Sequence, residues 1–402
     1  MLAQLLRTLL SSLISGVIHY YVWRRVVRDP QWPRRARRLA TTVLIAMYVA
    51  APLTMIATRL GAATLATALG WVAMPWMVAV GLTAVWLGGL DLLRGGAAIA
   101  ARLRSARAAR PQAATVLAPA DVPDPARRIF LARAASGTAL AATAASLSAG
   151  MMSARGDHEV VTVELELPRL PRALDGFSIV QLTDLHVGIT IDREFVQRVV
   201  QRANALRPDL IALTGDLVDG KVEELRDEIA PLRELRAPHG VYAVTGNHEY
   251  YSGVDPWIAE ISRLGVRYLR NERVEIGAGG DGFELAGIDD HSAHKWPGHG
   301  ADLAAAVRGR DPSRALVLLA HQPRQVREAV KHGVDLQLSG HTHGGQVWPW
   351  HYIARAQQEG LLSGLYQRGP TQVYVSRGCG YFGPPIRLAA PLEITRIVLR
   401  AR

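Results

Sequence analysis

The chain has 402 residues, a formal net charge of +11 and a single cysteine, Cys379. This length suits a membrane region joined to one sizeable globular domain, while one cysteine excludes both an internal disulfide and a cysteine-based zinc site. Residues 1–150 hold 17 Arg and no Lys against four acids, a net charge of +13, so the total of +11 leaves −2 for residues 151–402.

Three apolar stretches in the Arg-rich third have the length of membrane-spanning helices. They run from Thr8 to Trp23, Leu39 to Ala57 and Trp71 to Leu90, each close to the roughly 20 residues that cross a bilayer. A fourth stretch, Ile129 to Met152, is richer in small residues and contains Arg133. We therefore predict a transmembrane region of about four helices over 1–152, followed by a catalytic domain over 153–402. Because the positive charge lies in this region, we expect no nucleic-acid partner.

The placement of Arg predicts the orientation of these spans. Seven Arg lie in 24–38 and seven in 94–128, whereas the segment between the second and third spans has only Arg59. The positive-inside rule makes the two Arg-rich loops cytoplasmic. We therefore expect a multi-pass protein of the inner (cytoplasmic) membrane. If the fourth stretch crosses the membrane, the domain after it is extracytoplasmic. If that stretch lies along the membrane surface, the domain stays in the cytoplasm. Arg127-Arg128 either resembles a twin-arginine export signal or serves as an ordinary positive-inside anchor of the fourth stretch, and both interpretations place the domain outside.

Beyond residue 160, short apolar runs alternate with helical patterns, which is typical of an α/β domain. Residues 161–167 alternate between apolar and polar, as in a half-exposed strand. The remaining expected strands cover 177–182, 210–213, 241–244, 316–320, 336–338, 372–376 and 393–399. The expected helices cover 195–206, 223–236, 256–269 and 324–332.

Five of these strands lead directly into residues of metal-binding type. The blocks are Asp184-Leu185-His186, Gly215-Asp216-Leu217-Val218-Asp219, Gly246-Asn247-His248-Glu249, His321, and Gly340-His341-Thr342-His343. In α/β sheets, ligands bind beyond the carboxyl ends of strands. Carboxylate, amide and imidazole donors together suit Mn, Fe or Zn. The sequence therefore predicts a metallohydrolase, although Asn247 alone could be a turn residue and His321 alone a core residue.

All five blocks, in this order, resemble the calcineurin-like metallophosphoesterase family over roughly residues 177–345. The resemblance implies a metallophosphoesterase β-sandwich flanked by helices. The predicted spans and the tail segments 375–378 and 384–387 are similar to the membrane-anchored, exported bacterial branch of that family.

The resemblance also implies the roles of individual residues. Asp216 would bridge two divalent ions, and His248 would be the catalytic residue at the leaving oxygen. Asp219 and Glu249 would orient the ligand or catalytic imidazoles. One ion would be held by Asp184, His186 and His343, and the other by Asn247, His321 and His341. Mn, Fe or Zn is expected, with Mg also allowed.

The expected function is a membrane-anchored, dinuclear phosphoester hydrolase, acting as phosphodiesterase, pyrophosphatase or phosphatase. A metal-bridging hydroxide would attack in line. The partner would be a phosphoester, and a lipid-linked or cell-envelope phosphate is favoured because several spans anchor the domain. The alternative is a membrane signalling or transport protein with a non-catalytic metal-binding domain.

Other polar and aromatic residues have more than one interpretation. A loop between the third and fourth blocks is either solvated or contacts substrate; it contains His291, His294 and His299. Arg377 and Arg387 are either phosphate ligands or ordinary surface residues. Four aromatic residues could wall the site, meet a membrane interface or pack in the core: Tyr250, Tyr251, Trp348 and Trp350.

Overall fold

The computed structural model describes residues 2–59, 62–108, 124–277 and 281–402. The chain divides into two compact units, Met1–Ser148 and Ala149–Arg402. The boundary expected from the sequence, after residue 152, falls within the last turns of the helix that leads from one unit to the other. Part of the Arg-rich segment 94–128, residues 109–123, lies outside the described residues.

The first unit is helical. Its elements are α1 (Leu2–Val22), the π-helix η1 (Trp23–Arg28), α2 (Arg34–Arg59), α3 (Ala63–Ala108) and α4 (Pro125–Arg155), which ends in the second unit. By length and composition, two stretches of the described helices could cross a membrane, Arg34–Thr54 and Thr64–Ser105. The spans expected on α1 and α4 remain predictions.

Polar side chains within the helical unit contact one another. The Arg25 guanidinium lies 2.6 Å from the Asp91 carboxylate, which also accepts a hydrogen bond from the Tyr21 hydroxyl at 2.8 Å. The Trp76 indole donates to His19 Nε2 at 3.2 Å. Groups that would be costly to leave unpaired among apolar helices therefore have partners.

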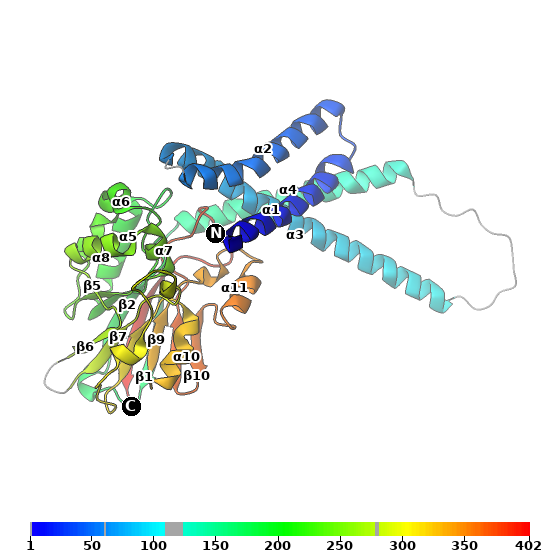
Figure 1. Cartoon of the computed structure of the whole chain (residues 1–402). Helices are drawn as coiled ribbons and strands as arrows, with labels where there is room; N and C mark the ends of the chain where they lie inside the picture. Colours follow the sequence, from blue (N-terminus) through cyan, green and yellow to red (C-terminus); the bar gives the residue numbers. More distant parts are fainter. Residues whose placement is uncertain (1, 60–61, 109–123, 278–280) are drawn as a thin grey trace. The chain divides into compact units, whose positions relative to one another are not determined.

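Two six-stranded mixed sheets form the centre of the second unit (Figure 1). In spatial order, the first contains β1 (Glu159–Leu167), β12 (Glu393–Ala401), β2 (Ser178–Leu182), β3 (Leu210–Leu213), β4 (Val241–Ala243) and β5 (Arg267–Tyr268). The second contains β10 (Gly364–Arg368), β11 (Thr371–Val375), β9 (Leu336–Ser339), β8 (Leu316–Leu319), β7 (Phe283–Gly287) and β6 (Glu272–Ile276).

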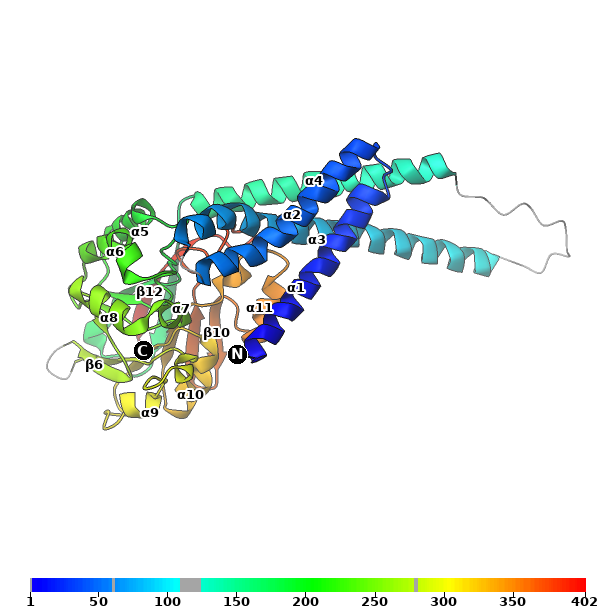
Figure 2. The ribbon, with the colours of Figure 1, turned by 45° about the horizontal axis from the view of Figure 1, so that its top comes forward.

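The two sheets face each other across a buried core, and helices cover their outer faces. In β3, Leu210 and Ala212 join the core between the sheets, whereas Ile211 and Leu213 pack with α5 (Arg193–Ala205), α6 (Val222–Ile229) and α8 (Val254–Arg263). Leu316 and Leu318 of β8 pack with α9 (Leu303–Ala306) and α10 (Val326–Lys331). Figure 2 shows α5 and α6 on one side of this unit and α9 and α10 on the other. The expected β-sandwich flanked by helices is confirmed.

Shorter elements complete the second unit. They are α7 (Asn247–Ser252), α11 (His351–Gln357), and the 3₁₀ helices η2 (Arg172–Leu174), η3 (Ala230–Glu234), η4 (Ala293–Lys295), η5 (Pro323–Gln325) and η6 (His343–Gly345).

The sequence prediction was wrong about the segment 264–269. It extended a helix to residue 269, but α8 ends at Arg263, and residues 267–268 form β5 beside β4. Gly265 adopts a φ of +92°, which ends the helix and which other residues rarely adopt. Three strands were also missed, β6, β7 and β10, because their runs mix apolar with charged or Gly residues.

Candidate metal centre

The predicted metal-binding blocks come from strand ends of both sheets. Strands β2, β3 and β4 of the first sheet are parallel neighbours, as are β8 and β9 of the second. The residues that follow these strands meet in three groups whose donor atoms lie within 4.8 Å of one another. The groups are Asp184, His186 and His343; Asp216, His321 and His341; and His186, Asp216 and His248.

The backbone at these positions is strained. Five non-glycine residues of the blocks have φ between 51° and 71°: Asp184, His186, Asp216, His341 and His343. A side chain in this left-handed region costs roughly 1–3 kcal/mol and persists where the surroundings impose it, as at functional sites. The turns after the strands thus direct carboxylates and imidazoles inward against their local preference.

The first group is tightly clustered and buried. The Nε2 atoms of His186 and His343 lie 3.0 Å apart, and His343 Nε2 lies 3.3 Å from Asp184 Oδ1. The Asp184 side chain is fully buried, and burial, reinforced by Asp216, raises the pKa of its carboxyl group. A cation among these atoms would stabilise the charged carboxylate and offset the cost of burying it.

Asp216 lies between the first and second groups. Its Oδ2 is 3.1 Å from His321 Nε2 and 3.8 Å from His186 Nε2, and His321 Nε2 is 3.2 Å from His341 Nδ1. The backbone amide of His248 donates to Asp216 Oδ1 at 2.8 Å. One carboxylate therefore reaches histidines of both the first and the second group, hereafter the two clusters, as a bridging ligand must.

Asn247 has an unused oxygen at the site. Among the described residues, the buried Oδ1 of Asn247 accepts no hydrogen bond. Leaving a buried carbonyl oxygen without a partner costs about 1–3 kcal/mol. A cation would satisfy this oxygen, so the donor set fits a metal site.

The surroundings favour the neutral imidazole form, which binds metals, at His341 and His343. At His321, burial alone would lower the pKa, but the Asp216 carboxylate outweighs it and raises the pKa well above its usual value. Burial lowers the pKa of His341 to about 3. Burial, and next the Arg387 guanidinium, hold the pKa of His343 well below its usual value. His321 directs Nδ1 to the Thr214 carbonyl at 2.8 Å, which leaves Nε2 free to face the cluster.

His248 is oriented by Asp219, which also orients His186. Asp219 Oδ1 lies 2.5 Å from His248 Nδ1 and 2.9 Å from His186 Nδ1. Burial alone would lower the pKa of His248, but the carboxylates of Asp216 and Asp219 outweigh it and raise the pKa to about 9. His248 Nε2 lies 4.0 Å from Asp216 Oδ2, so this nitrogen faces the cluster and can hold a proton there.

Glu249 orients backbone rather than imidazoles, which corrects one expectation. Its carboxylate accepts hydrogen bonds from the amides of Asp216, Leu217 and Gly246, at 3.0, 2.6 and 2.6 Å. This buried side chain therefore fixes the loop that carries Asp216 against the start of α7.

Two glycines allow the blocks to approach each other. A Cβ atom on Gly246 would collide with the Asp216 carboxylate, and one on Gly340 would collide with that of Asp184. The glycine before each ligand block is thus required by close packing across strand ends.

The two Arg residues considered as phosphate ligands are used inside the protein. Arg387 is buried, and its guanidinium donates to the His343 carbonyl at 2.9 Å and lies 3.1 Å from His343 Nδ1. Arg377 pairs with Glu393 at 2.6 Å and with Glu159 at 2.7 Å. The phosphate interpretation is not supported. The sequence carried no signal that Arg387 supports His343, because the contact joins distant segments.

The remaining residues with open interpretations are also placed. His299 Nδ1 accepts from Arg270, which pairs with Asp289, while His291 is exposed and His294 contacts the His291 carbonyl. None of the three histidines belongs to the metal groups found among the described residues. Two further aromatics differ in exposure: Tyr250 is buried, whereas Tyr251 is exposed. Trp348 and Trp350 are half-buried.

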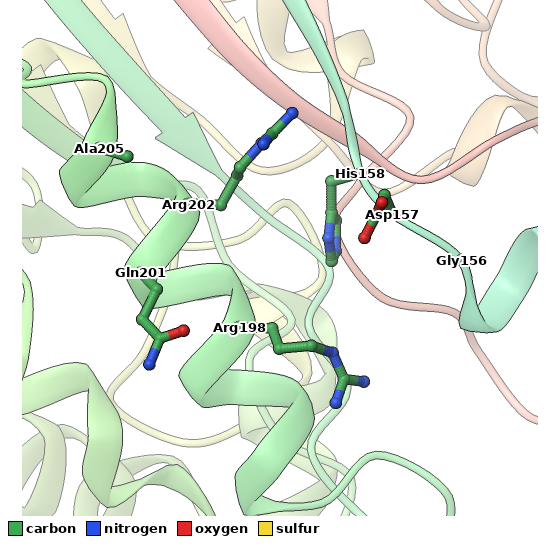
Figure 3. A pocket seen from close by; sticks show the side chains of 7 residues that line it. All are labelled: Gly156, Asp157, His158, Arg198, Gln201, Arg202 and Ala205. Atoms are coloured by element: carbon green, nitrogen blue, oxygen red, sulfur yellow. The ribbon is translucent and has the colours of Figure 1, made fainter.

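A separate cavity of about 320 Å³ lies beside α5 (Figure 3). It is lined by Gly156, Asp157, His158, Arg198, Gln201, Arg202 and Ala205. His158 contacts the Cys379 carbonyl at 2.8 Å, and burial lowers its pKa to about 4. No lining residue belongs to the metal groups, so this cavity is distinct from the candidate centre.

The comparisons with known proteins agree with this geometry. Residues 177–345 match the family described as calcineurin-like phosphoesterase. The chain is 41% identical over 264 residues to a bovine (Bos taurus) transmembrane protein with a metallophosphoesterase domain, covering 63% of this chain and 59% of that protein. It is 36% identical over 250 residues to a metallophosphoesterase of Aquifex aeolicus, covering 61% of this chain and 92% of that protein.

A solved structure is also similar. The calcineurin-like phosphoesterase YfkN from Bacillus subtilis aligns with a TM-score of 0.34 and 16% identity, covering 51% of this chain and 82% of that chain. The chain spans about 59% of the length of the bovine relative. The family match, the similarity over 92% of the Aquifex protein and the buried His/Asp metal-binding site all agree. The chain therefore belongs to the calcineurin-like metallophosphoesterase family of metal-dependent enzymes.

Proposed function

We propose that the centre holds two divalent ions through the seven side chains named from the sequence. Asp184, His186 and His343 would bind one ion, and Asp216 would be shared. Asn247, His321 and His341 would bind the other. The observation that carries this proposal is the convergence of five strand ends, from two sheets, on one buried cluster in which Asn247 Oδ1 has no partner among the described residues. Mn, Fe or Zn suits the donor set, and Mg is allowed.

When bound, the two ions would supply Lewis acidity and lower the pKa of water. The chain's own residues do the rest. Asp219 holds the His248 ring through Nδ1, which leaves Nε2 to donate a proton to, or hydrogen-bond with, the leaving oxygen. Asp219 fixes His186 through the same oxygen. One carboxylate therefore orients both a metal-binding imidazole and the catalytic imidazole.

The function that this site supports best is hydrolysis of a phosphoester by a membrane-anchored enzyme. The transmembrane description of the bovine relative and the apolar helices support anchoring. An amphiphilic, lipid-linked or cell-envelope phosphate is the favoured substrate, because several spans would hold the enzyme at a membrane. The alternative, a signalling or transport protein with a non-catalytic domain, is disfavoured because every expected ligand residue is present.

We also propose the division and orientation expected from the sequence. Residues 1–152 would form the transmembrane region, with Arg-rich loops in the cytoplasm, and residues 153–402 the catalytic domain outside it, as in an exported bacterial branch of the family. The Arg distribution supports this orientation.

Purified full-length protein, stripped by a chelator and reloaded separately with Mn, Zn, Fe or Mg, would test the function. We expect two equivalents of metal to bind and to restore hydrolysis of a phosphodiester, a lipid pyrophosphate or a phosphomonoester. Tight binding of two ions with no hydrolysis of any of these esters would favour the non-catalytic alternative. One equivalent of metal would contradict the ligand assignment.

A further inference from the structure

Two exposed aromatic side chains border the histidines of the metal centre. Phe382 is 53% exposed, and its ring centroid lies 5.1 Å from that of His248 and 5.7 Å from that of His186. Tyr251 is 61% exposed, and its ring lies 5.3 Å from His248. Both rings meet His248 at an interplanar angle of 70°. Core packing does not account for large rings that remain this exposed.

The position of Phe382 is fixed by the turn that carries His343. The Gln346 side chain donates to the Phe382 carbonyl at 2.7 Å and accepts from the Phe382 amide at 2.9 Å. The backbone amide of Gln346 in turn donates to the His343 carbonyl at 3.0 Å. The exposed ring is therefore held at a set distance from a metal-binding residue, as binding surfaces that are organised in advance require.

Tyr251 is placed by a different element. It lies on α7, which begins at Asn247, so one turn of helix joins a metal-binding residue to this ring. Its ring also lies 5.7 Å from that of Trp296. Two segments distant in the sequence thus place aromatic rings around the same imidazole.

We propose that Tyr251 and Phe382 clamp the leaving group of the substrate, and that this group is apolar carbon joined directly to the ester oxygen. The inference rests on the proposed function, in which His248 serves the leaving oxygen. Rings in contact with His248 and His186 border the first atoms beyond that oxygen. Phe382 offers no hydrogen-bonding side-chain atom, so a polyhydroxyl group would lose water there without compensation.

Both an alkyl chain and an aryl ring have this chemistry. Each would bury apolar surface against the two rings, and a planar group would add edge or stacked contacts. An ester whose phosphate is joined to a glycerol or sugar carbon bearing hydroxyl groups fits less well. The experiment must therefore compare alkyl, aryl and polar leaving groups.

The test uses full-length, metal-loaded protein and the variants Phe382→Ala, Phe382→Leu and Tyr251→Ala. The matched control is Tyr352→Ala on α11, which removes a similarly exposed aromatic ring (64%) that lies tilted against the His351 ring. Methyl, hexyl, phenyl and glyceryl phosphate esters would be compared, as monoesters and as methyl diesters. Metal content would be measured for every variant.

We expect the ratio of kcat/KM for the hexyl or phenyl ester to that for the methyl ester to fall about tenfold in Phe382→Ala. It should fall less in Phe382→Leu and stay at the native value in Tyr352→Ala. A larger loss for the hexyl ester in Phe382→Ala assigns an alkyl substrate, and a larger loss for the phenyl ester assigns an aryl one, because the comparison with the native protein cancels the different pKa values of the leaving groups. An unchanged ratio in both Phe382→Ala and Tyr251→Ala overturns the clamp while leaving the proposed hydrolysis intact.

A binding measurement decides the matter independently of turnover. Calorimetry would compare hexylphosphonate with methylphosphonate on the same proteins. Tighter binding of hexylphosphonate that is lost in Phe382→Ala supports the clamp even if no ester is hydrolysed, which would contradict the proposed function alone. Equal binding of the two phosphonates by the native protein overturns the clamp.

Discussion

The two units of this protein differ in where their apolar side chains point. Among the described residues, 30 large hydrophobic side chains are exposed, and 23 of them lie in residues 1–148. In the catalytic unit, by contrast, the apolar residues of β2, β3, β8 and β9 are fully buried. The same residue types thus face outward in one unit and inward in the other, which is the difference between a helix surface suited to lipid and a core formed in water.

The catalytic unit also buries charged and polar groups at the candidate metal centre. Asp184 and Asp216 are almost fully buried in the catalytic unit, alongside three imidazoles that are also buried, those of His186, His321 and His343. Buried charge is costly unless it is paired or coordinates a metal. The strained turns, the close-packed glycines and the Glu249 hydrogen bonds hold these groups together, so the sandwich stabilises an arrangement that its polar residues would not adopt alone.

The largest expected effect concerns membrane topology, that is, the side of the membrane on which the catalytic unit lies, because a reporter signal there is all-or-none. A reporter active only outside the cytoplasm, fused after Arg402, should give full signal, because the two Arg-rich loops are expected in the cytoplasm. The same reporter fused after Arg38 should be silent. A silent fusion after Arg402, with strong signal from a cytoplasmic reporter there, would place the catalytic domain inside and leave the metal chemistry unaffected.

Within the catalytic unit, Asp216→Ala should have the largest effect. Hydrolysis should be abolished and both ions lost or disordered, because Asp216 alone reaches both clusters. Metal content of purified protein measures this directly. Asp255→Ala, which removes a 70% exposed carboxylate, should keep native metal content. Two full equivalents of metal in Asp216→Ala would remove this residue from its bridging role.

Local patterns in the sequence identify residues that meet at the candidate metal centre, but they do not encode the strand pairing that brings these residues together. Strand ends followed by Asp184-Leu185-His186 or Gly340-His341-Thr342-His343 are local patterns, and apolar runs mark such strands reliably. That the strands belong to two facing sheets depends on long-range pairing, such as that of β11 with β9, which no local pattern encodes. The Phe382 and Arg387 contacts could not be predicted for the same reason, since each joins segments far apart in the chain.

His248→Ala should have a smaller effect than loss of Asp216. We expect about 10²–10⁴-fold lower kcat, the usual contribution of general acid catalysis, with metal content retained because the variant keeps all seven proposed ligands. The loss should shrink for a nitrophenolate leaving group, which needs little protonation. An equal loss for leaving groups of high and low pKa would show that His248 acts through its charge or through structure instead.

The smallest expected effects come from a matched pair of leucines, which tests the comparison between the units. Leu182 is fully buried in β2, whereas Leu39 in α2 is 68% exposed. Leu182→Ala leaves a cavity in a packed core and should cost about 2–5 kcal/mol. For a unit of this size, that cost lowers the thermal midpoint of metal release by about 5–15 °C. Leu39→Ala should change the same midpoint, measured in detergent, by less than about 2 °C, because surface substitutions usually stay within about 0.5 kcal/mol. Equal shifts for the two variants would mean that Leu39 packs against protein, and the outward-facing apolar surface of the helical unit would then need another explanation than lipid.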